Sequence, residues 1–135
     1  MSRKALFALL IAAQAAHSVE ECRFRLYDVL APARFISRLV SSDPARGFAL
    51  ANVALVTFGV WCYVARVRPE HPSAFRWMWF WVLLEAVNGT NHLLFALYTR
   101  RYFPGAWTAP LLLSVAVALG VTLARGREDR RFVRS

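Results

Sequence analysis

Four apolar segments, each long enough to cross a lipid bilayer, constrain this chain more than any other feature. They cover residues 5–22, 47–67, 74–98 and 106–124, and about 20 mostly apolar residues suffice for a spanning helix. Pro69 and Pro72 follow the second segment, and Pro104 with Gly105 follows the third, which marks turns. We therefore expect an all-α integral membrane protein, a four-helix bundle forming one domain over residues 1–135.

Residues 23–46, which join the first two segments, have a different pattern. Apolar residues such as Phe35 and Leu39 alternate with Arg34 and Arg38, and Pro32 interrupts the stretch. This pattern is typical of an amphipathic segment that lies in the membrane interface. Residues 125–135 are rich in arginine, and we expect them to form a solvated basic tail.

The net charge of +9 points to lipid rather than to nucleic acid as the partner. In a soluble protein such a charge would suggest nucleic-acid binding. Here the arginines flank apolar segments, so anionic lipid headgroups are the expected partners and no nucleic acid is expected. The placement of arginine and lysine slightly favours both termini on the cytoplasmic side. Cys22 and Cys62 form no CxxC pair, so a thiolate zinc site is not expected.

A second interpretation of the N-terminus is a signal peptide. Arg3 and Lys4 precede an apolar core, and Ala13-Gln14-Ala15 resembles a cleavage site. Removal of residues 1–15 would leave three spans instead of four.

Ionisable residues inside two of the apolar segments indicate a functional site. The first segment ends in His17-Ser18-Val19-Glu20-Glu21, and the third contains Glu85, Asn88 and His92. Such groups are rare in membrane spans and usually mark ion paths, proton relays or catalytic sites. The spacings place each set on one helical face. At about 1.5 Å per residue, the two sets lie at a similar depth, so we expect them to meet between the first and third spans.

His17-Ser-Val-Glu-Glu21 resembles the motif of the HXXEE family of small bacterial integral membrane proteins. Glu85-Ala-Val-Asn88 with His92 resembles the second polar motif of that family, and Tyr102-Phe-Pro104-Gly105-Ala-Trp-Thr108 resembles its loop before the last span. The function of the family is largely unknown. The resemblance therefore implies an architecture and a site in the bacterial cytoplasmic membrane, but no reaction.

Two imidazoles with carboxylates suit one divalent zinc, iron or manganese ion. We expect His17, Glu21 and His92 to bind it, although Glu20 would serve equally as the third ligand. Glu20, Glu85 and Asn88 are the candidate catalytic residues, with Glu20 or Glu85 as general acid or base, and Trp81 is the candidate for the substrate pocket. A cluster that holds no metal and only joins the two spans is the structural alternative.

These residues favour a membrane-embedded enzyme acting on a lipid-soluble substrate, such as an isoprenoid or another amphiphile. In a metal-assisted version the ion acts as a Lewis acid or activates water or oxygen. In a metal-free version, with no cofactor, a protonated glutamic acid drives isomerisation or cyclisation. A small proton or metal-ion transporter or binding subunit is the alternative from another class, and the oligomeric state stays open.

Overall fold

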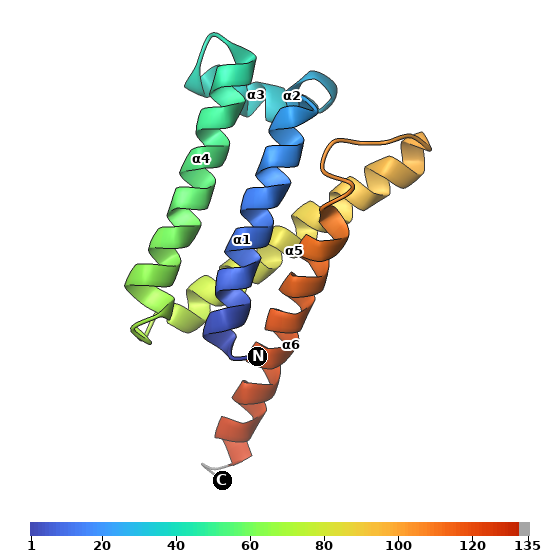
Figure 1. The fold of residues 1–135 in the computed structure, drawn as a ribbon. Helices are drawn as coiled ribbons and strands as arrows, with labels where there is room; N and C mark the ends of the chain where they lie inside the picture. Colours follow the sequence, from blue (N-terminus) through green and yellow to red (C-terminus); the bar gives the residue numbers. More distant parts are fainter. Residues whose placement is uncertain (133–135) are drawn as a thin grey trace.

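The computed structural model describes residues 1–132, with side chains through Gly126, and these residues form six α-helices, one short π-helix and no strand (Figure 1). The long helices are α1 (Arg3–Arg23), α4 (Pro44–Cys62), α5 (Ala74–Thr99) and α6 (Ala109–Phe132). The short ones are α2 (Leu26–Val29), α3 (Ala31–Val40) and the π-helix η1 (Tyr63–Val67). The prediction of an all-α protein is confirmed for this part of the chain.

The four long helices run alternately up and down. In Figure 1, α1 lies between α4 and α6, α5 crosses behind them at a slant, and the start of α1 lies at the same end of the bundle as the last turns of α6. Among the long helices, α6 packs most closely against α5 and α1. The backbones of α1 and α5 stay further apart, so only long side chains bridge the space between them.

Three helical segments are long and apolar enough to cross a membrane: Arg3–Arg23, Pro44–Val67 and Ala109–Gly126. The expected fourth span, α5, is longer than each of these, but polar residues including Glu85, Asn88 and His92 reduce its apolar character. Large apolar side chains are exposed along all four helices, for example Val19, Val53, Leu83 and Val117. A soluble protein rarely exposes so many, and the distribution suits a surface that faces lipid.

The connection between α1 and α4 follows the predicted amphipathic pattern. Pro32 lies in the first turn of α3, a position that tolerates its missing N–H group, so it begins this helix instead of interrupting it. The small residues Ala33 and Ser37 are buried, while Phe35 and Leu39 are exposed at 65% and 71%. A side chain at Gly47 of α4 would collide with the Ser37 carbonyl group, so glycine lets α3 and α4 approach closely.

Local chemistry shifts two of the predicted boundaries. Helix α4 begins at Pro44, before the predicted residue 47, because the Asp43 carboxylate accepts hydrogen bonds from the Ala45 and Arg46 N–H groups. Helix α6 begins at Ala109, later than the predicted residue 106, because the preceding residues form a turn that contacts α1.

The predicted basic tail, residues 125–135, begins within a helix. Helix α6 continues through it to Phe132. The side chains of residues 127–135 lie outside the described part of the structure, so their predicted solvation is not tested.

Candidate metal centre

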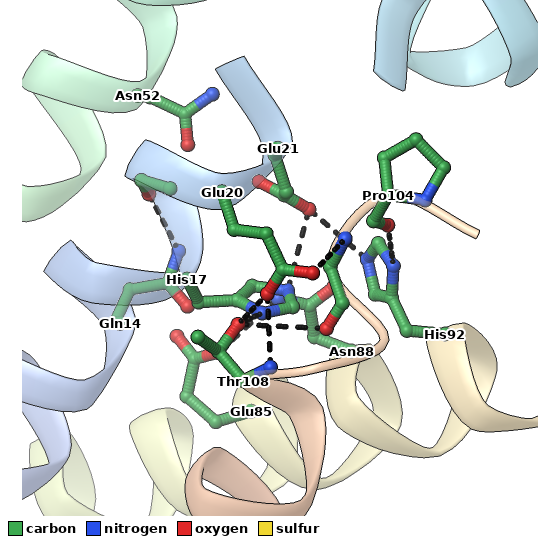
Figure 2. A network of polar contacts seen from close by, with 12 residues as sticks. Gln14, His17, Glu20, Glu21, Asn52, Glu85, Asn88, His92, Pro104 and Thr108 are labelled. Atoms are coloured by element: carbon green, nitrogen blue, oxygen red, sulfur yellow. Dashed lines mark hydrogen bonds and ion pairs between the residues drawn. The ribbon is translucent and has the colours of Figure 1, made fainter. Parts of the chain in front are cut away.

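Two histidines and a glutamate from different helices converge inside the bundle (Figure 2). His17 and Glu21 belong to α1, and His92 belongs to α5. Glu21 Oε1 lies 3.4 Å from His17 Nε2 and 3.0 Å from His92 Nε2. The two imidazole rings stand perpendicular, with centroids 4.6 Å apart. All three residues are buried, so the predicted meeting of the two polar sets is confirmed.

The geometry of these three residues fits a divalent metal ion. One ligand atom from each lies within 4.8 Å of the others. Two ligand atoms at about 2.0–2.1 Å from a tetrahedral zinc ion are about 3.3 Å apart, close to the spacings at Glu21. His17 Nε2 is buried and has no hydrogen-bond partner within the described residues. A buried nitrogen without a partner is costly, and a metal bond would satisfy it.

The second nitrogen of each ring contacts the segment between α5 and α6. His92 Nδ1 donates to the Pro104 carbonyl oxygen at 2.6 Å, and His17 Nδ1 lies 2.7 Å from Thr108 Oγ1. Metal-binding histidines usually have such a partner on the ring nitrogen that does not face the metal. Gly105 lies against both rings, with φ at +94°, and a Cβ there would meet His92 Nδ1 at 2.5 Å and His17 Cε1 at 2.8 Å.

The Glu20 carboxylate binds this same segment, which we call the docking loop (residues 102–108). It accepts hydrogen bonds from the Tyr102 hydroxyl, from the N–H groups of Gly105, Trp107 and Thr108, and from the Thr108 hydroxyl, at 2.6–3.1 Å. A carboxylate offers about four lone-pair positions, so its acceptor capacity is filled. This arrangement suits a role for Glu20 as an anchor that holds the docking loop in place before α6. It leaves Glu20 little freedom to transfer a proton.

Tyr102, which donates to Glu20 from its side chain, is partly exposed. Its ring packs against Trp107 and Phe24, with centroids 4.7 Å and 5.1 Å away. Partial burial, together with the hydrogen bond to Glu20, raises the pKa of the Tyr102 hydroxyl above its ordinary value. Tyr102 therefore remains a proton donor to Glu20 at any physiological pH.

A second buried polar group lies next to the three candidate ligands and contains Glu85. The side chain of Glu85 is fully buried, and one terminal atom of the Gln14 amide lies 2.7 Å from its Oε2. The other amide atom lies 3.0 Å from Ser18 Oγ, and Asn88 Nδ2 donates to Glu85 at 3.4 Å. Among the described residues, Glu85 forms no ion pair.

Gln14 can satisfy Glu85 in either protonation state. With its nitrogen toward Glu85, the amide donates to an ionised carboxylate and accepts from Ser18. With its oxygen toward Glu85, the amide accepts a hydrogen bond from the neutral acid and donates one to Ser18. Such a site can hold or release one proton without leaving a buried polar atom unpaired.

The structure places Trp81 in the apolar core, outside the group of candidate ligands. Its ring is fully buried among Phe7, Phe58 and Phe80, with centroids 6.0–6.5 Å apart. This placement favours a packing role over a place in a substrate pocket. Asn88 is half-buried and touches Glu85, so it lies beside the site as expected.

Sequence reasoning missed the supporting residues Gln14, Ser18, Tyr102, Gly105 and Thr108. Gln14 and Ser18 lie one turn apart, on the same helical face as His17 and Glu21, and this spacing was a signal that could have found them. The docking loop was marked by its resemblance to the family motif, but its contact with Glu20 had no local spacing signal, because the two lie more than 80 positions apart in the sequence.

Comparison with known proteins identifies the family. Residues 8–119 match the model of a family described as "Protein of unknown function with HXXEE motif". The match covers most of the chain, and the chain therefore belongs to this family. No curated protein and no solved structure matches it.

Replacing Tyr102 by Phe tests the contact between the docking loop and α1. Loss of the hydroxyl removes one hydrogen bond to a charged acceptor, so we expect the unfolding free energy to fall by about 1–2 kcal/mol. Folding raises the pKa of Tyr102. The contribution of its hydroxyl to the unfolding free energy is therefore fully present below the ordinary tyrosine pKa of about 10. The contribution then declines as the pH rises above that value.

Chemical unfolding in detergent between pH 7 and pH 11 measures this difference. The difference in unfolding free energy between the wild type and Tyr102→Phe should be largest near pH 7 and should decrease toward pH 11. Tyr98→Phe, which alters a side chain that is 88% exposed, is the matched control. Equal stability of the wild type and Tyr102→Phe at neutral pH would contradict the assigned contact.

Proposed function

We propose that this HXXEE-family protein is a membrane-embedded enzyme that binds one divalent metal ion and acts on a lipid-soluble substrate. The observation that carries the proposal is the convergence of His17 Nε2, His92 Nε2 and Glu21 Oε1 in a buried site beside a second buried carboxyl, Glu85. Two histidines with one carboxylate suit zinc, iron or manganese. Ionisable groups at this depth are costly, which favours a functional role.

We infer that α5 is a fourth span, with both termini in the cytoplasm of a bacterial cell. Its 26 residues extend about 39 Å, which exceeds the hydrocarbon thickness of about 30 Å. Its ionisable residues Glu85 and His92 are buried against α1, while Leu83, Val87 and Leu94 are exposed. Glu85 and His92 are thus shielded from lipid by the rest of the bundle, whereas Thr90 and Asn91 of the same helix are exposed.

Cysteine labelling tests the fourth span. The exposed residues Arg68 and Arg101 precede and follow α5, so single-cysteine variants at these positions should lie on opposite sides of the membrane. In a background without Cys22 and Cys62, a membrane-impermeant maleimide should label Arg101→Cys in intact cells and Arg68→Cys only after permeabilisation. Labelling of both variants from the same side would exclude the span.

Each side chain in the site has a distinct task in this proposal. His17, Glu21 and His92 would hold the ion, which when bound supplies Lewis-acid chemistry or an activated water or oxygen molecule. Glu85 transfers a proton, since Gln14 satisfies it with or without that proton. Asn88 positions Glu85 from the half-buried side, and Glu20 anchors the docking loop.

Metal analysis of the purified protein tests the ligand set. We expect about one equivalent of zinc, iron or manganese in the wild type. His17→Ala and His92→Ala should each lose affinity by more than the roughly 10–100-fold cost of removing a group hydrogen-bonded to a ligand. His71→Ala is the matched control, because the His71 side chain contacts Arg66 and Ser73, which lie outside the site. A metal-free wild type, or equal affinity in all three variants, would contradict the proposal.

Glu85→Gln tests proton transfer separately from metal binding. The amide keeps the size of the side chain but cannot act as an acid, and a general acid typically contributes about 10²–10⁴-fold to a rate. We expect metal content to stay at the wild-type level while product formation falls by at least about 100-fold. The assay compares lipid extracts, by mass spectrometry and retention time, from cells that express the wild type or a variant.

Glu70→Gln is the control for this substitution, because Glu70 is exposed and pairs with Lys4 at the other end of α1. It should give the same lipid profile as the wild type. Wild-type levels of product from Glu85→Gln, or no lipid change on expression of the wild type, would contradict the assigned role.

A metal-free acid–base isomerase or cyclase is the second candidate, and it is supported by Glu85, a buried carboxyl with no ion pair among the described residues. A buried carboxyl without an ion pair tends to hold its proton, as an acid that protonates a double bond must. This candidate predicts product formation by metal-depleted wild type and its loss in Glu85→Gln.

A transporter receives less support. Asn52, Ser114 and Thr122 each donate to a carbonyl oxygen of their own helix. These bonds satisfy the side chains locally instead of extending a polar path through α4 and α6.

A further inference from the structure

We propose that Thr108 positions the imidazole of His17 for metal binding, and that Glu20 acts on His17 through Thr108. The inference rests on the proposed metal centre, and it assigns a task to two residues that bind no metal themselves. Thr108 Oγ1 lies 2.6 Å from Glu20 Oε2 and 2.7 Å from His17 Nδ1, so it connects the two side chains of α1 through the docking loop.

The direction of these hydrogen bonds follows from counting protons. The Thr108 hydroxyl has one proton and two acceptor positions. Glu20 accepts four other hydrogen bonds, from Tyr102 and three backbone N–H groups, as an ionised carboxylate does, and an ionised carboxylate can only accept. The Thr108 proton therefore points to Glu20. Its oxygen is then left to accept a hydrogen bond from His17 Nδ1–H.

The consequence for His17 lies on the other side of the ring. In a neutral imidazole only one nitrogen carries a proton, so a protonated Nδ1 leaves a lone pair on Nε2. That lone pair faces the space beside Glu21 Oε1 and has no other partner in the described residues. The opposite tautomer would place a hydrogen atom where the ion is expected.

The docking loop orients the second histidine in the same way. The Pro104 carbonyl oxygen can only accept, so His92 donates to it from Nδ1 at 2.6 Å. The lone pair of His92 Nε2 then faces Glu21 as well. One loop, held to α1 by Glu20, thus sets the tautomers of both candidate ligands, and partners of this kind typically change metal affinity 10–100-fold.

Three variants of threonine test the inference. Thr108→Val keeps the shape but removes the hydroxyl, and Thr108→Ser restores it. Thr122→Val is the matched control, because the Thr122 hydroxyl donates only to the Ala118 carbonyl of its own helix. Two measurements are made on full-length protein in detergent. Competition with a chromophoric chelator gives the zinc affinity, and ¹⁵N NMR of histidine side chains in metal-free protein gives the tautomer of His17.

We expect Thr108→Val to bind zinc about 10–100-fold more weakly than the wild type, with Thr108→Ser and Thr122→Val close to the wild type. In the metal-free wild type and in Thr108→Ser, the proton of neutral His17 should lie on Nδ1, and Thr108→Val should lose this preference. A structural role alone would not shift the tautomer.

Other outcomes overturn the inference. One is that Thr108→Val binds zinc as tightly as the wild type, and another is that Thr108→Ser binds zinc as weakly as Thr108→Val. A third is that the proton of neutral His17 lies on Nε2 in the wild type. If the wild type binds no zinc, iron or manganese, the proposed function fails. The NMR measurement then still decides whether Thr108 orients His17: a tautomer that changes in Thr108→Val supports the orientation, and an unchanged tautomer refutes it.

Discussion

The Glu20 carboxylate holds the docking loop against α1, and the candidate site depends on this contact. Five donors from four residues of the loop point at its two oxygens. Three of them are backbone N–H groups in the turn just before α6, and a negative charge near a helix N-terminus also interacts favourably with the helix dipole. This anchor holds Pro104, Gly105 and Thr108 against the two imidazoles.

The spacing of the HXXEE motif acquires a physical meaning in this arrangement. His17 and Glu21, one turn apart on α1, face His92 of α5. Glu20, one position earlier than Glu21, is rotated by about 100° around the helix and reaches the loop instead. The two adjacent glutamates therefore contact different parts of the protein. One faces the candidate metal position, and the other fixes the loop that orients the histidines.

The separation of α1 and α5 explains why long polar side chains fill the interface. Their backbones do not approach closely, so small residues would leave a void there. Histidine, glutamate and glutamine bridge the gap and contact one another. At the other end of the interface, Phe7 and Trp81 bridge it with apolar contacts. The same spacing thus supports an apolar half and a polar half.

Helical periodicity made the core of the site predictable from sequence. Residues His17, Glu21 and His92 lie on regular helices, so their faces and depths follow from a rise of about 1.5 Å per residue, and the structure brings them together as expected. The role of Glu20 could not be predicted, because it depends on the path of an irregular loop. The first residue of α6 could not be predicted for the same reason, because the helix begins where that loop ends. The position of Trp81 on its helix is the same for a residue that lines a pocket and for one that packs in the core. The sequence therefore could not distinguish these two roles, and only the neighbouring side chains do so.

X-ray absorption spectroscopy at the edge of the bound metal tests the central claim most directly, because it measures the ligands themselves. Purified, metal-loaded protein should give a first shell with two imidazole nitrogens and carboxylate oxygen at about 2.0–2.2 Å. The outer-shell scattering typical of histidine rings should accompany it. A shell of sulfur at about 2.3 Å, or of oxygen alone without imidazole scattering, would contradict the account.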